Sequence, residues 1–387
     1  MKDVFIVGSK GIPANYGGFE TFVDNLVSRQ DDKQIKYHIA CMTFDKEPRQ
    51  YEYAGADCQE ITVPNIGGSK AILYDLRALD WALEKIKQEN MRDGIVYILA
   101  CRVGPFVQRY VKKFHKYGFK VWVNPDGHEW KRAKWSAPVR KYWKVSERLM
   151  VKHADFLVCD SRSIEAYIKH DYAKYDPQTT FIAYGADITA SKLADNDPKV
   201  TKWYAKHQVT PNDYFLIVGR FVPENNYETM IREFMASDVK QDLVIITNVE
   251  QNRFYDELKQ KTHFENDPRI KFVGTVYDAE LLKYIRENAL GYLHGHSVGG
   301  TNPSLLEALG STRLNLLLDV GFNKEVGESG ALYWGTNPGE LKQVLESVAK
   351  LDQAQKDQLA KAAKQRIKQQ YSWEKIVTDY ENIFLRG

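Results

Sequence analysis

Short apolar runs alternate with helix-like patterns along most of the chain. Residues 4–7 are Val, Phe, Ile and Val, an uninterrupted apolar run that is typical of a strand buried on both faces. Similar runs occupy 35–43, 95–101, 119–124, 155–159 and 179–184, and a second series occupies 214–219, 242–247, 270–274, 290–294 and 314–318. Apolar residues with helical spacing lie between most of them. This alternation predicts mainly parallel sheets covered by helices on both faces.

A polar, proline-containing stretch at 191–212 separates the two series and reads as an interdomain connection. We therefore expect one doubly wound α/β domain over residues 1–190 and a second over 213–368, with a central cleft between them. Helical patterns close the chain up to about residue 386. Doubly wound sheets bind ligands at the carboxyl ends of their strands, so the loops at those ends hold the candidate chemistry.

The composition, with 43% apolar and 27% charged residues among 387, is that of a soluble globular protein. No apolar run approaches the roughly 18 residues of a membrane span, and no signal-peptide pattern opens the chain. The four cysteines (41, 58, 101 and 159) form no Cys-x-x-Cys pair, which argues against a zinc site or a disulfide framework. We expect buried thiols in a reducing cytoplasm.

Basic residues are concentrated in one region. Between Arg102 and Lys152 the chain has fourteen Lys or Arg and three acidic residues, whereas its overall net charge is +3. Such asymmetry indicates an anionic partner: a nucleic acid, a phosphorylated substrate or an acidic membrane surface.

Three loops of the first series carry candidate groups. Gly17 and Gly18 open a helix after the first strand, where a phosphate could approach the backbone; a simple chain turn is the alternative. Asp126 and His128 follow the strand at 119–124 and could supply an acid and a base, or form an ordinary Asp-Gly turn. Asp160 also ends a strand, where a capping role is the more frequent one.

In the second series, Arg220 follows the first strand and could bind a diphosphate or form a surface ion pair. A Gly-Gly-Thr-Asn-Pro-Ser run at 299–304 opens a helix and is typical of an anion site, with Glu307 placed to accept from a ribose hydroxyl. The His-x-His pair at 294 and 296 lacks further ligands, so we expect no metal.

These motifs resemble the retaining, two-domain (GT-B) glycosyltransferases of family four over nearly the whole chain. The resemblance rests on Gly-Arg-x-x-Pro-Glu at 219–224, Arg-Ile-Lys-Phe-Val-Gly at 269–274 and Pro-Ser-Leu-Leu-Glu-Ala-Leu at 303–309. Tyr-Ser-Trp-Glu-Lys-Ile at 371–376 looks like the start of the terminal helix that crosses back to the first domain, here 369–387. The opening Gly-Ser-Lys-Gly-Ile-Pro-Ala-Asn-Tyr-Gly-Gly-Phe-Glu-Thr is similar to bacterial β-1,4-rhamnosyltransferases, which use dTDP-L-rhamnose and a lipid-diphosphate-linked acceptor.

Two positions depart from the general family. The first glutamate of its Glu-x7-Glu motif is Gly299 here, and the lysine of its Arg/Lys pair is Asn225. Both changes fit a donor other than the common ones, or else an inactive relative.

The resemblance implies a mechanism without a metal, a cofactor or an enzyme nucleophile. It places the donor nucleotide and diphosphate on Gly17, Gly18, Arg220, Gly300, Thr301, Asn302, Ser304 and Glu307. Acceptor binding and proton handling are expected from Asp126, His128, Asp160 and Tyr184.

Aromatic residues alternate with cations in the basic region, as in a helix that lies on an anionic membrane. The residues expected at such a surface are Trp130, Lys131, Arg132, Lys134, Trp135, Arg140, Lys141, Trp143 and Lys144. The predicted protein is thus a cytoplasmic enzyme at the inner face of the plasma membrane, which transfers rhamnose to a lipid-diphosphate-linked GlcNAc or glucose in cell-surface polysaccharide synthesis. The alternatives are a retaining transferase with a UDP-sugar donor and a non-catalytic protein of the same fold that binds a membrane surface or a nucleic acid.

Overall fold

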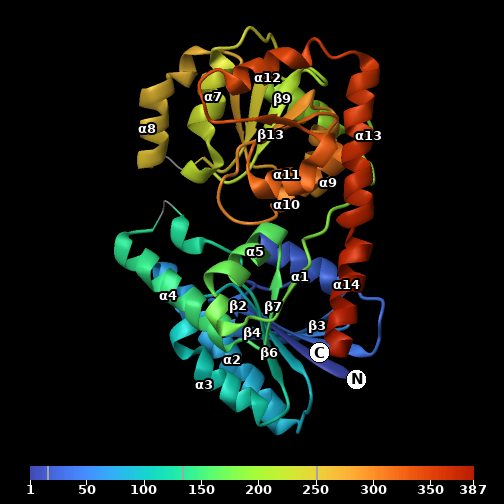
Figure 1. The fold of residues 1–387 in the computed structure, drawn as a ribbon. Helices are drawn as coiled ribbons and strands as arrows, with labels where there is room; N and C mark the ends of the chain where they lie inside the picture. Colours follow the sequence, from blue (N-terminus) through green and yellow to red (C-terminus); the bar gives the residue numbers. More distant parts are fainter. Residues whose placement is uncertain (15–16, 133–134, 250–251) are drawn as a thin grey trace. The chain divides into compact units, whose positions relative to one another are not determined.

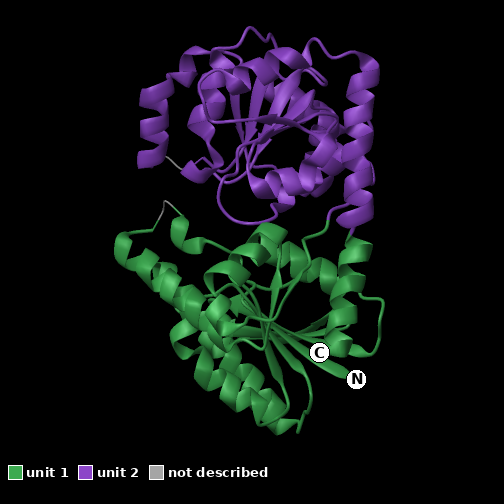
Figure 2. Cartoon of the chain, in the orientation of Figure 1, with its two compact units in different colours: residues 1–185, 373–387 green, residues 186–372 purple. Residues whose placement is uncertain are grey.

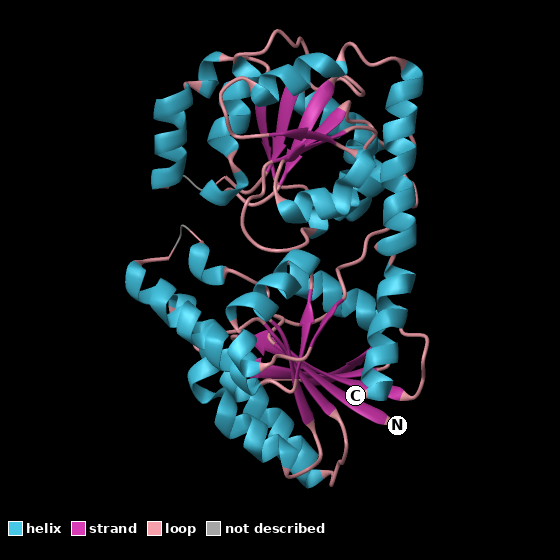
Figure 3. Ribbon diagram, viewed as in Figure 1, coloured by secondary structure: helices cyan, strands magenta, loops and turns pink. Residues whose placement is uncertain are grey.

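The computed structural model describes residues 1–14, 17–132, 135–249 and 252–387. The chain forms two compact units (Figure 2): unit 1 is Met1–Gly185 with Trp373–Gly387, and unit 2 is Ala186–Ser372. Each unit has one sheet with helices packed on its two faces (Figure 3).

Unit 1 is built on a sheet in the order β3-β4-β2-β1-β5-β6-β7-β8 (Figure 1). Its strands are β1 (Lys2–Val7), β2 (Ile35–Thr43), β3 (Gln50–Tyr53), β4 (Ala56–Thr62), β5 (Ile95–Leu99), β6 (Lys120–Asn124), β7 (Phe156–Cys159) and β8 (Thr179–Phe181). Its helices are α1 (Gly18–Ser28), α2 (Lys70–Gln88), α3 (Gly104–His115), α4 (Ala137–His153), α5 (Arg162–Asp171) and α14 (Trp373–Arg386). The strands pair in parallel except β3, which runs antiparallel to β4. This hairpin was not expected from the sequence, because Gln50–Tyr53 is too polar to stand out as a strand.

Alternation of side chains along the strands divides unit 1 into two cores. Phe5 and Val7 of β1 face α2, α3, α4 and α5. On the other face, Phe22 of α1 packs against Tyr380 of α14, with ring centroids 4.9 Å apart. Phe384 of α14 packs against Trp122 of β6, with ring centroids 5.5 Å apart.

Unit 2 has a wholly parallel sheet in the order β11-β10-β9-β12-β13-β14. Its strands are β9 (Tyr214–Val218), β10 (Asp242–Ile246), β11 (Ile270–Gly274), β12 (Gly291–His294), β13 (Asn315–Leu318) and β14 (Leu332–Trp334). Its helices are α6 (Pro198–His207), α7 (Tyr227–Met235), α8 (Arg253–Thr262), α9 (Ala279–Glu287), α10 (Pro303–Ser311), α11 (Gly321–Gly327), α12 (Glu340–Val348) and α13 (Gln353–Gln370). The predicted α/β fold with two Rossmann-like sheets is confirmed.

The expected domain boundaries need correction. Residues 191–212 are not a free connection, because Trp203 and Tyr204 of α6 are buried against Tyr214 and Leu216 of β9. They belong to unit 2, whose first residue is Ala186. The chain returns to unit 1 at Trp373, so residues 369–372 also belong to unit 2.

The closing helix α14 is part of the unit 1 core, so we expect Phe384→Ala to destabilise the protein. Phe384 is fully buried, and its removal leaves a cavity that costs roughly 3–5 kcal/mol of unfolding free energy. Leu385→Ala is the control on the same helix, because Leu385 is 37% exposed and its truncation costs under about 1 kcal/mol. Urea denaturation measures both, and equal losses would contradict the assignment of Phe384 to the core.

Candidate functional site

Two loops of unit 2 meet where the chain reverses its direction across the sheet. Strands β9 and β12 are neighbours, and the chain continues to β10 on one side of β9 and to β13 on the far side of β12. Ligands of doubly wound sheets bind at such a point, outside the carboxyl ends of the strands. The loop after β9 contains Arg220, and the loop after β12 leads into α10.

Side-chain hydrogen bonds join these two loops. Asn225 Nδ2 donates to the carbonyl of Arg220 at 2.7 Å, and Asn225 Oδ1 lies 2.8 Å from His296 Nδ1. Asn226, in the left-handed region at φ 55°, donates from Nδ2 to the carbonyl of Gly295 at 2.7 Å. Asn225 therefore braces the loops, at the position where the resembled family has a diphosphate-binding lysine.

Arg220 has a fixed backbone and a solvent-exposed side chain. Its carbonyl accepts from Asn225, whereas no hydrogen bond or ion pair to its guanidinium is found in the described part of the chain. A guanidinium with this freedom can bind a diphosphate through two parallel hydrogen bonds.

The start of α10 differs from the expected anion site. Asn302 Oδ1 accepts from the backbone N–H of Ser304 at 2.9 Å and of Leu305 at 3.4 Å. Proline at 303 has no N–H to offer. The amide of Ser304 is thus capped by the protein itself, so an incoming phosphate must use the backbone around Gly300, Thr301 and Asn302.

Ser304 and Glu307 share a buried arginine that the sequence analysis missed. Ser304 Oγ lies 3.0 Å from Tyr292 Oη and 3.2 Å from Arg286 Nη2, so the side chain faces inward. The donor contact expected at Ser304 was its backbone N–H, and that group is the one Asn302 already caps. Arg286 Nη2 also lies 2.7 Å from Glu307 Oε2. Arg286 is on α9, and sequence alone does not reveal which face of that helix a single arginine occupies.

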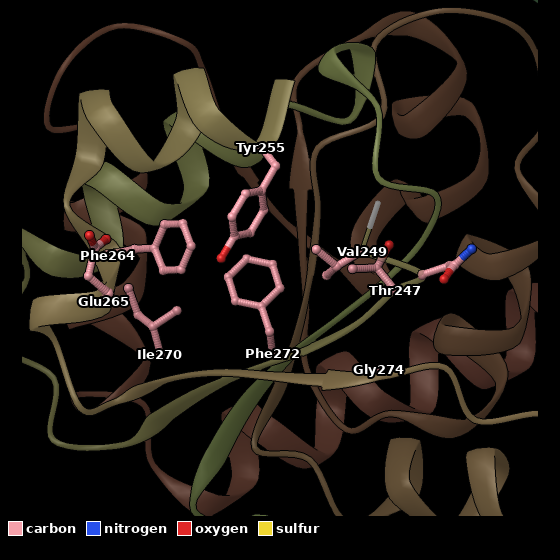
Figure 4. A pocket seen from close by; sticks show the side chains of 9 residues that line it. Thr247, Val249, Tyr255, Phe264, Glu265, Ile270, Phe272 and Gly274 are labelled. Atoms are coloured by element: carbon pink, nitrogen blue, oxygen red, sulfur yellow. The ribbon is translucent and has the colours of Figure 1, made fainter. Parts of the chain in front are cut away.

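Unit 2 also contains a cavity of about 500 Å³ beside its edge strand (Figure 4). Thr247 and Gly274 lie where β10 and β11 end, and Tyr255 and Phe272 point toward each other within the cavity. The Thr247 hydroxyl is buried without a hydrogen-bond partner among the described residues. The remaining lining residues are Asn248, Val249, Phe264, Glu265 and Ile270. These side chains come from several elements between residues 247 and 274 and form no recognisable motif, so the sequence did not indicate the cavity.

In unit 1, carboxylates of α1 already bind the loop that follows β1. Glu20 Oε1 accepts from the N–H of Lys10 at 2.7 Å, and Asp24 Oδ2 accepts from the N–H of Ala14 at 2.7 Å. Gly17 has φ 134°, and a Cβ there would lie 1.8 Å from Glu20 Oε2. Negative charge at this helix start argues against the phosphate expected at Gly17 and Gly18.

A buried ion pair supports the base of the same loop. Arg102 Nη1 donates to the carbonyl of Gly8 at 2.9 Å and lies 3.2 Å from Asp75 Oδ2. Asp75 is fully buried; burial raises the pKa of its carboxyl to about 6, an effect that Arg102 partly offsets. Tyr74 donates from Oη to the carbonyl of Ser9 at 2.7 Å, so two neighbouring residues of α2 fix the loop.

Three of the residues expected to bind the acceptor lie near Asn124, at the carboxyl ends of β6 and β7: Asp126, Asp160 and Tyr184. Asn124 Oδ1 accepts from the N–H of Asp126 at 2.8 Å. Burial raises the pKa of Tyr184, and the negative charges of Asp160 and Asp126 raise it further. The phenol of Tyr184 is therefore protonated and buried, so it can donate a hydrogen bond but cannot act as a base.

His128 packs against an aromatic ring of α5. Its ring lies 4.1 Å from that of Tyr167 on α5, and its φ of 56° is in the left-handed region. Burial and the charges of Lys131 and Lys144 lower the pKa of His128 to about 4. A base with so low a pKa is weak at neutral pH, which argues against His128 as the proton acceptor.

Several residues expected at a membrane surface have internal partners instead. Arg132 is buried and ion-paired with Glu129, and Glu129 Oε1 also accepts from Trp135 Nε1 at 2.9 Å. Lys144 donates to Tyr167 Oη at 2.6 Å and lies 4.5 Å from the ring centre of Trp130. The membrane-surface roles expected for Trp130, Trp135, Arg132 and Lys144 are therefore wrong, because these side chains contact other residues of unit 1.

Of the rest of that set, the side chains of three cations, Lys131, Arg140 and Lys141, are exposed. Trp143 packs against Trp135, with ring centroids 5.9 Å apart. Lys134 lies outside the described residues.

No helix in the described ranges combines the length and apolar character that a membrane crossing requires. The described ranges also contain no cluster of three His, Cys, Asp or Glu side chains suited to a metal ion.

Comparisons with known proteins agree with this architecture. The family described as "Domain of unknown function (DUF1972)" matches residues 1–187. A curated relative, the uncharacterized glycosyltransferase MJ1069 of Methanocaldococcus jannaschii, is 24% identical over 251 residues, which are 63% of this chain. The match spans 62% of the length of that relative.

Among solved structures, sucrose-phosphate synthase from Thermosynechococcus elongatus superimposes with a TM-score of 0.80 at 16% identity, over 100% of this chain and 99% of the other. Anabaena HepE in complex with UDP gives a TM-score of 0.71 at 13% identity, over 100% of both chains. A UDP-forming trehalose-phosphate synthase from Burkholderia xenovorans gives 0.76 at 10% identity, again over 100% of both chains. The chain therefore has the GT-B fold of two Rossmann-like sheets.

Asp75 should make the stability of the protein depend on pH. Its folded pKa of about 6 exceeds the ordinary value of 3.8, so its stabilising contribution is complete below pH 4 and is lost as the pH rises through 6. We expect the unfolding free energy of the wild type, relative to Asp75→Asn, to fall by up to roughly 3 kcal/mol between pH 4 and 7. Denaturant titrations at several pH values measure this difference. Glu84→Gln, exposed on the same helix, should keep the wild-type slope, and an unchanged slope in Asp75→Asn would contradict the prediction.

Proposed function

We propose that this protein is a glycosyltransferase that binds a nucleotide-sugar donor on unit 2. The observation that carries the proposal is the pair of braced loops after β9 and β12, which border an exposed Arg220 and the carboxylate of Glu307. The likeness of the fold to HepE in complex with UDP and the 24% identity to the glycosyltransferase MJ1069 support it.

In the proposed reaction, negative charge develops on the diphosphate as its bond to the sugar breaks. Arg220 neutralises that charge through charge-assisted hydrogen bonds, the type of interaction that contributes most to such catalysis. Glu307 accepts a hydrogen bond from the sugar of the nucleotide. Asp126 remains the first candidate for the acceptor proton, with Asp160 beside it and Tyr184 as a hydrogen-bond donor.

For the substrates, we propose dTDP-L-rhamnose as donor and a lipid-diphosphate-linked GlcNAc or glucose as acceptor, with retention of configuration and without a metal. Support comes from the motifs shared with rhamnosyltransferases and from position 299. Gly299 has φ 123°, a conformation that favours glycine, so a glutamate there would be strained. The loop therefore lacks the family's usual contact to the donor sugar, which suits a donor other than the common ones.

Product formation tests this proposal directly. The protein is incubated with dTDP-L-rhamnose, UDP-glucose or UDP-GlcNAc and each lipid-linked acceptor, with and without EDTA. Transfer from dTDP-L-rhamnose alone, undiminished by EDTA, would support donor and mechanism together. Transfer from a UDP-sugar would favour the alternative donor, and no transfer from any donor would contradict the activity.

Arg220→Ala should lower kcat/KM by about a hundredfold or more, because the leaving diphosphate loses its cation. Arg232→Ala, on an exposed face of α7 in the same unit, is the matched control and should retain activity. Steady-state kinetics with the active donor distinguish the two variants. Equal rates in both would remove Arg220 from the proposed mechanism.

We also propose that the protein docks on the cytoplasmic face of the plasma membrane through α3 and α4. These helices pack together, with the N–H of Gly104 donating to Ser146 Oγ at 2.8 Å. Their exposed cations have no ion pair within the described part of the chain and are Arg109, Lys112, Lys113, Arg140, Lys141, Arg148 and Lys152. Each cation near an anionic surface contributes about 1 kcal/mol, and the 37% exposed Phe106 adds an apolar contact.

Replacing Arg109, Lys112, Arg140 and Lys141 together by serine should weaken binding to phosphatidylglycerol-containing vesicles by at least about tenfold. Co-sedimentation measures the binding, and vesicles of phosphatidylcholine alone should bind neither protein. The control variant loses the same charge from unit 2, at Lys202, Lys206, Lys361 and Lys368. Equal weakening in both variants would contradict a specific docking face.

A further inference from the structure

Two exposed apolar side chains lie at the carboxyl ends of neighbouring strands in unit 1. Phe44 follows β2 and is 53% exposed, and Ile66 lies in the loop after β4 and is 50% exposed. Apart from the first residue, Met1, they are the most exposed large apolar residues in the described part of unit 1. Large apolar side chains gathered on one exposed surface indicate a binding partner.

The two loops form one surface. The N–H of Val63 donates to the carbonyl of Thr43 at 3.0 Å, so the strand pairing continues to the point where both loops begin. Lys70, the first residue of α2, connects the tips: its Nζ lies 5.1 Å from the centre of the Phe44 ring and donates to Asn65 Oδ1 at 3.0 Å. The apolar tips and one ammonium group are therefore held side by side.

The loop after β4 satisfies part of its own polar backbone. Residues 64–69 are all exposed, and the proline at 64 has no N–H. The N–H of Ile66 donates to the carbonyl of Pro64 at 2.9 Å, and Ser69 Oγ donates to the carbonyl of Ile66 at 3.1 Å. Polar groups that already have a partner lose less free energy when they leave water. This loop can therefore enter an apolar environment at a low cost.

The apolar tips are next to the basic region of unit 1. Helix α2 covers the same face of the sheet as α3 and α4. A Cβ at Gly68 would lie 4.0 Å from the ring of Trp135, which packs against Trp143 of α4. Arg140 and Lys141 of α4 are exposed. Apolar side chains beside cations match the boundary of an anionic bilayer, where the acyl chains begin just below the lipid phosphates.

Asp45 limits how far these loops can enter a bilayer. It directly follows Phe44 and is exposed, and its Oδ2 accepts from Thr43 Oγ1 at 3.3 Å. A carboxylate is costly in hydrocarbon, so the loops reach the level where the headgroups end and go no deeper.

We propose that the loops after β2 and β4 insert Phe44 and Ile66 into the boundary between the headgroups and the acyl chains of an anionic lipid bilayer, with Lys70 at the level of the lipid phosphates. The inference rests on the membrane docking proposed above and deepens it. It adds an apolar contact that salt does not screen, and it identifies two loops at strand ends, rather than α3 and α4, as the part of the protein that enters the lipid.

Fluorescence of a labelled cysteine tests the insertion directly. The four native cysteines are buried, so the thiol-reactive dye NBD labels the new cysteine of the full-length Ile66→Cys protein selectively. With phosphatidylglycerol-containing vesicles, the emission should shift to the blue, lipids brominated on the acyl chains should quench it, and aqueous iodide should lose access to the dye. Tyr277→Cys is the matched control: this residue of unit 2 is 75% exposed, and a dye there should stay accessible to iodide.

Vesicle co-sedimentation measures the contribution of the two side chains to binding. Replacing Phe44 and Ile66 together by serine should weaken binding by about tenfold, because two half-exposed apolar side chains no longer leave water. The factor should be the same at about 0.1 M and about 1 M salt, since screening acts on charges only. Tyr277→Ser combined with Leu385→Ser removes exposed apolar groups elsewhere and should bind like the wild type. Circular dichroism verifies that all variants are folded.

The outcomes separate this inference from the proposed docking. If the protein sediments with the vesicles while the dye at position 66 stays accessible to iodide, or if the double serine variant binds as tightly as the wild type, the insertion of these loops is overturned and docking through α3 and α4 remains. If the folded wild type does not sediment with phosphatidylglycerol-containing vesicles at either salt concentration, the proposed docking and this inference are both overturned.

Discussion

The hydrogen bonds of Asn225 are the constraint on which the candidate donor site depends. One side chain joins the carbonyl of Arg220 to His296, and so ties the end of β9 to the loop after β12. Without this brace, both loops would have to become ordered when a ligand binds, and the loss of conformational entropy would weaken binding. Rigid loops also hold the Arg220 backbone still while its side chain stays exposed. Asn225, which replaces the lysine of the resembled family, therefore has a structural role in joining the two loops.

Secondary structure and the places of the loops could be predicted because they depend on local patterns. The apolar runs at 4–7 and 214–219 became central strands, and Arg220 and Asp126 do follow strand ends. The direction of a side chain could not be predicted, because it depends on residues far away in sequence. The N–H of Ser304, expected to bind the donor diphosphate, is capped by Asn302. Arg132, expected at a membrane surface, is buried beside Glu129. A count of charges reveals a basic region but not which cations already have partners.

The domain limits failed for a related reason. Residues 191–212 are polar and contain proline, yet Val200, Trp203 and Tyr204 anchor α6 on the sheet of unit 2. Composition averages over a segment, whereas packing depends on a few large side chains within it. In α14, large side chains again decide the packing: Tyr380 and Phe384 hold this helix on unit 1, the unit to which the terminal helix was expected to return.

The candidate loops of the two units differ in the charge of the side chains that accept from their backbone amides. The loop after β1 in unit 1 and the loops after β9 and β12 in unit 2 lie where the chain reverses across each sheet, and the backbone amides there need acceptors. In unit 1 the acceptors are the carboxylates of Glu20 and Asp24, whereas at the start of α10 in unit 2 the acceptor is the neutral amide of Asn302. An anion is therefore repelled by the first loop and tolerated near Arg220 in unit 2. A neutral ligand rich in hydroxyl groups has the reverse preference, because carboxylates accept hydrogen bonds from hydroxyls. This difference in charge supports the proposed binding of the nucleotide diphosphate on unit 2 and of the sugar acceptor on unit 1.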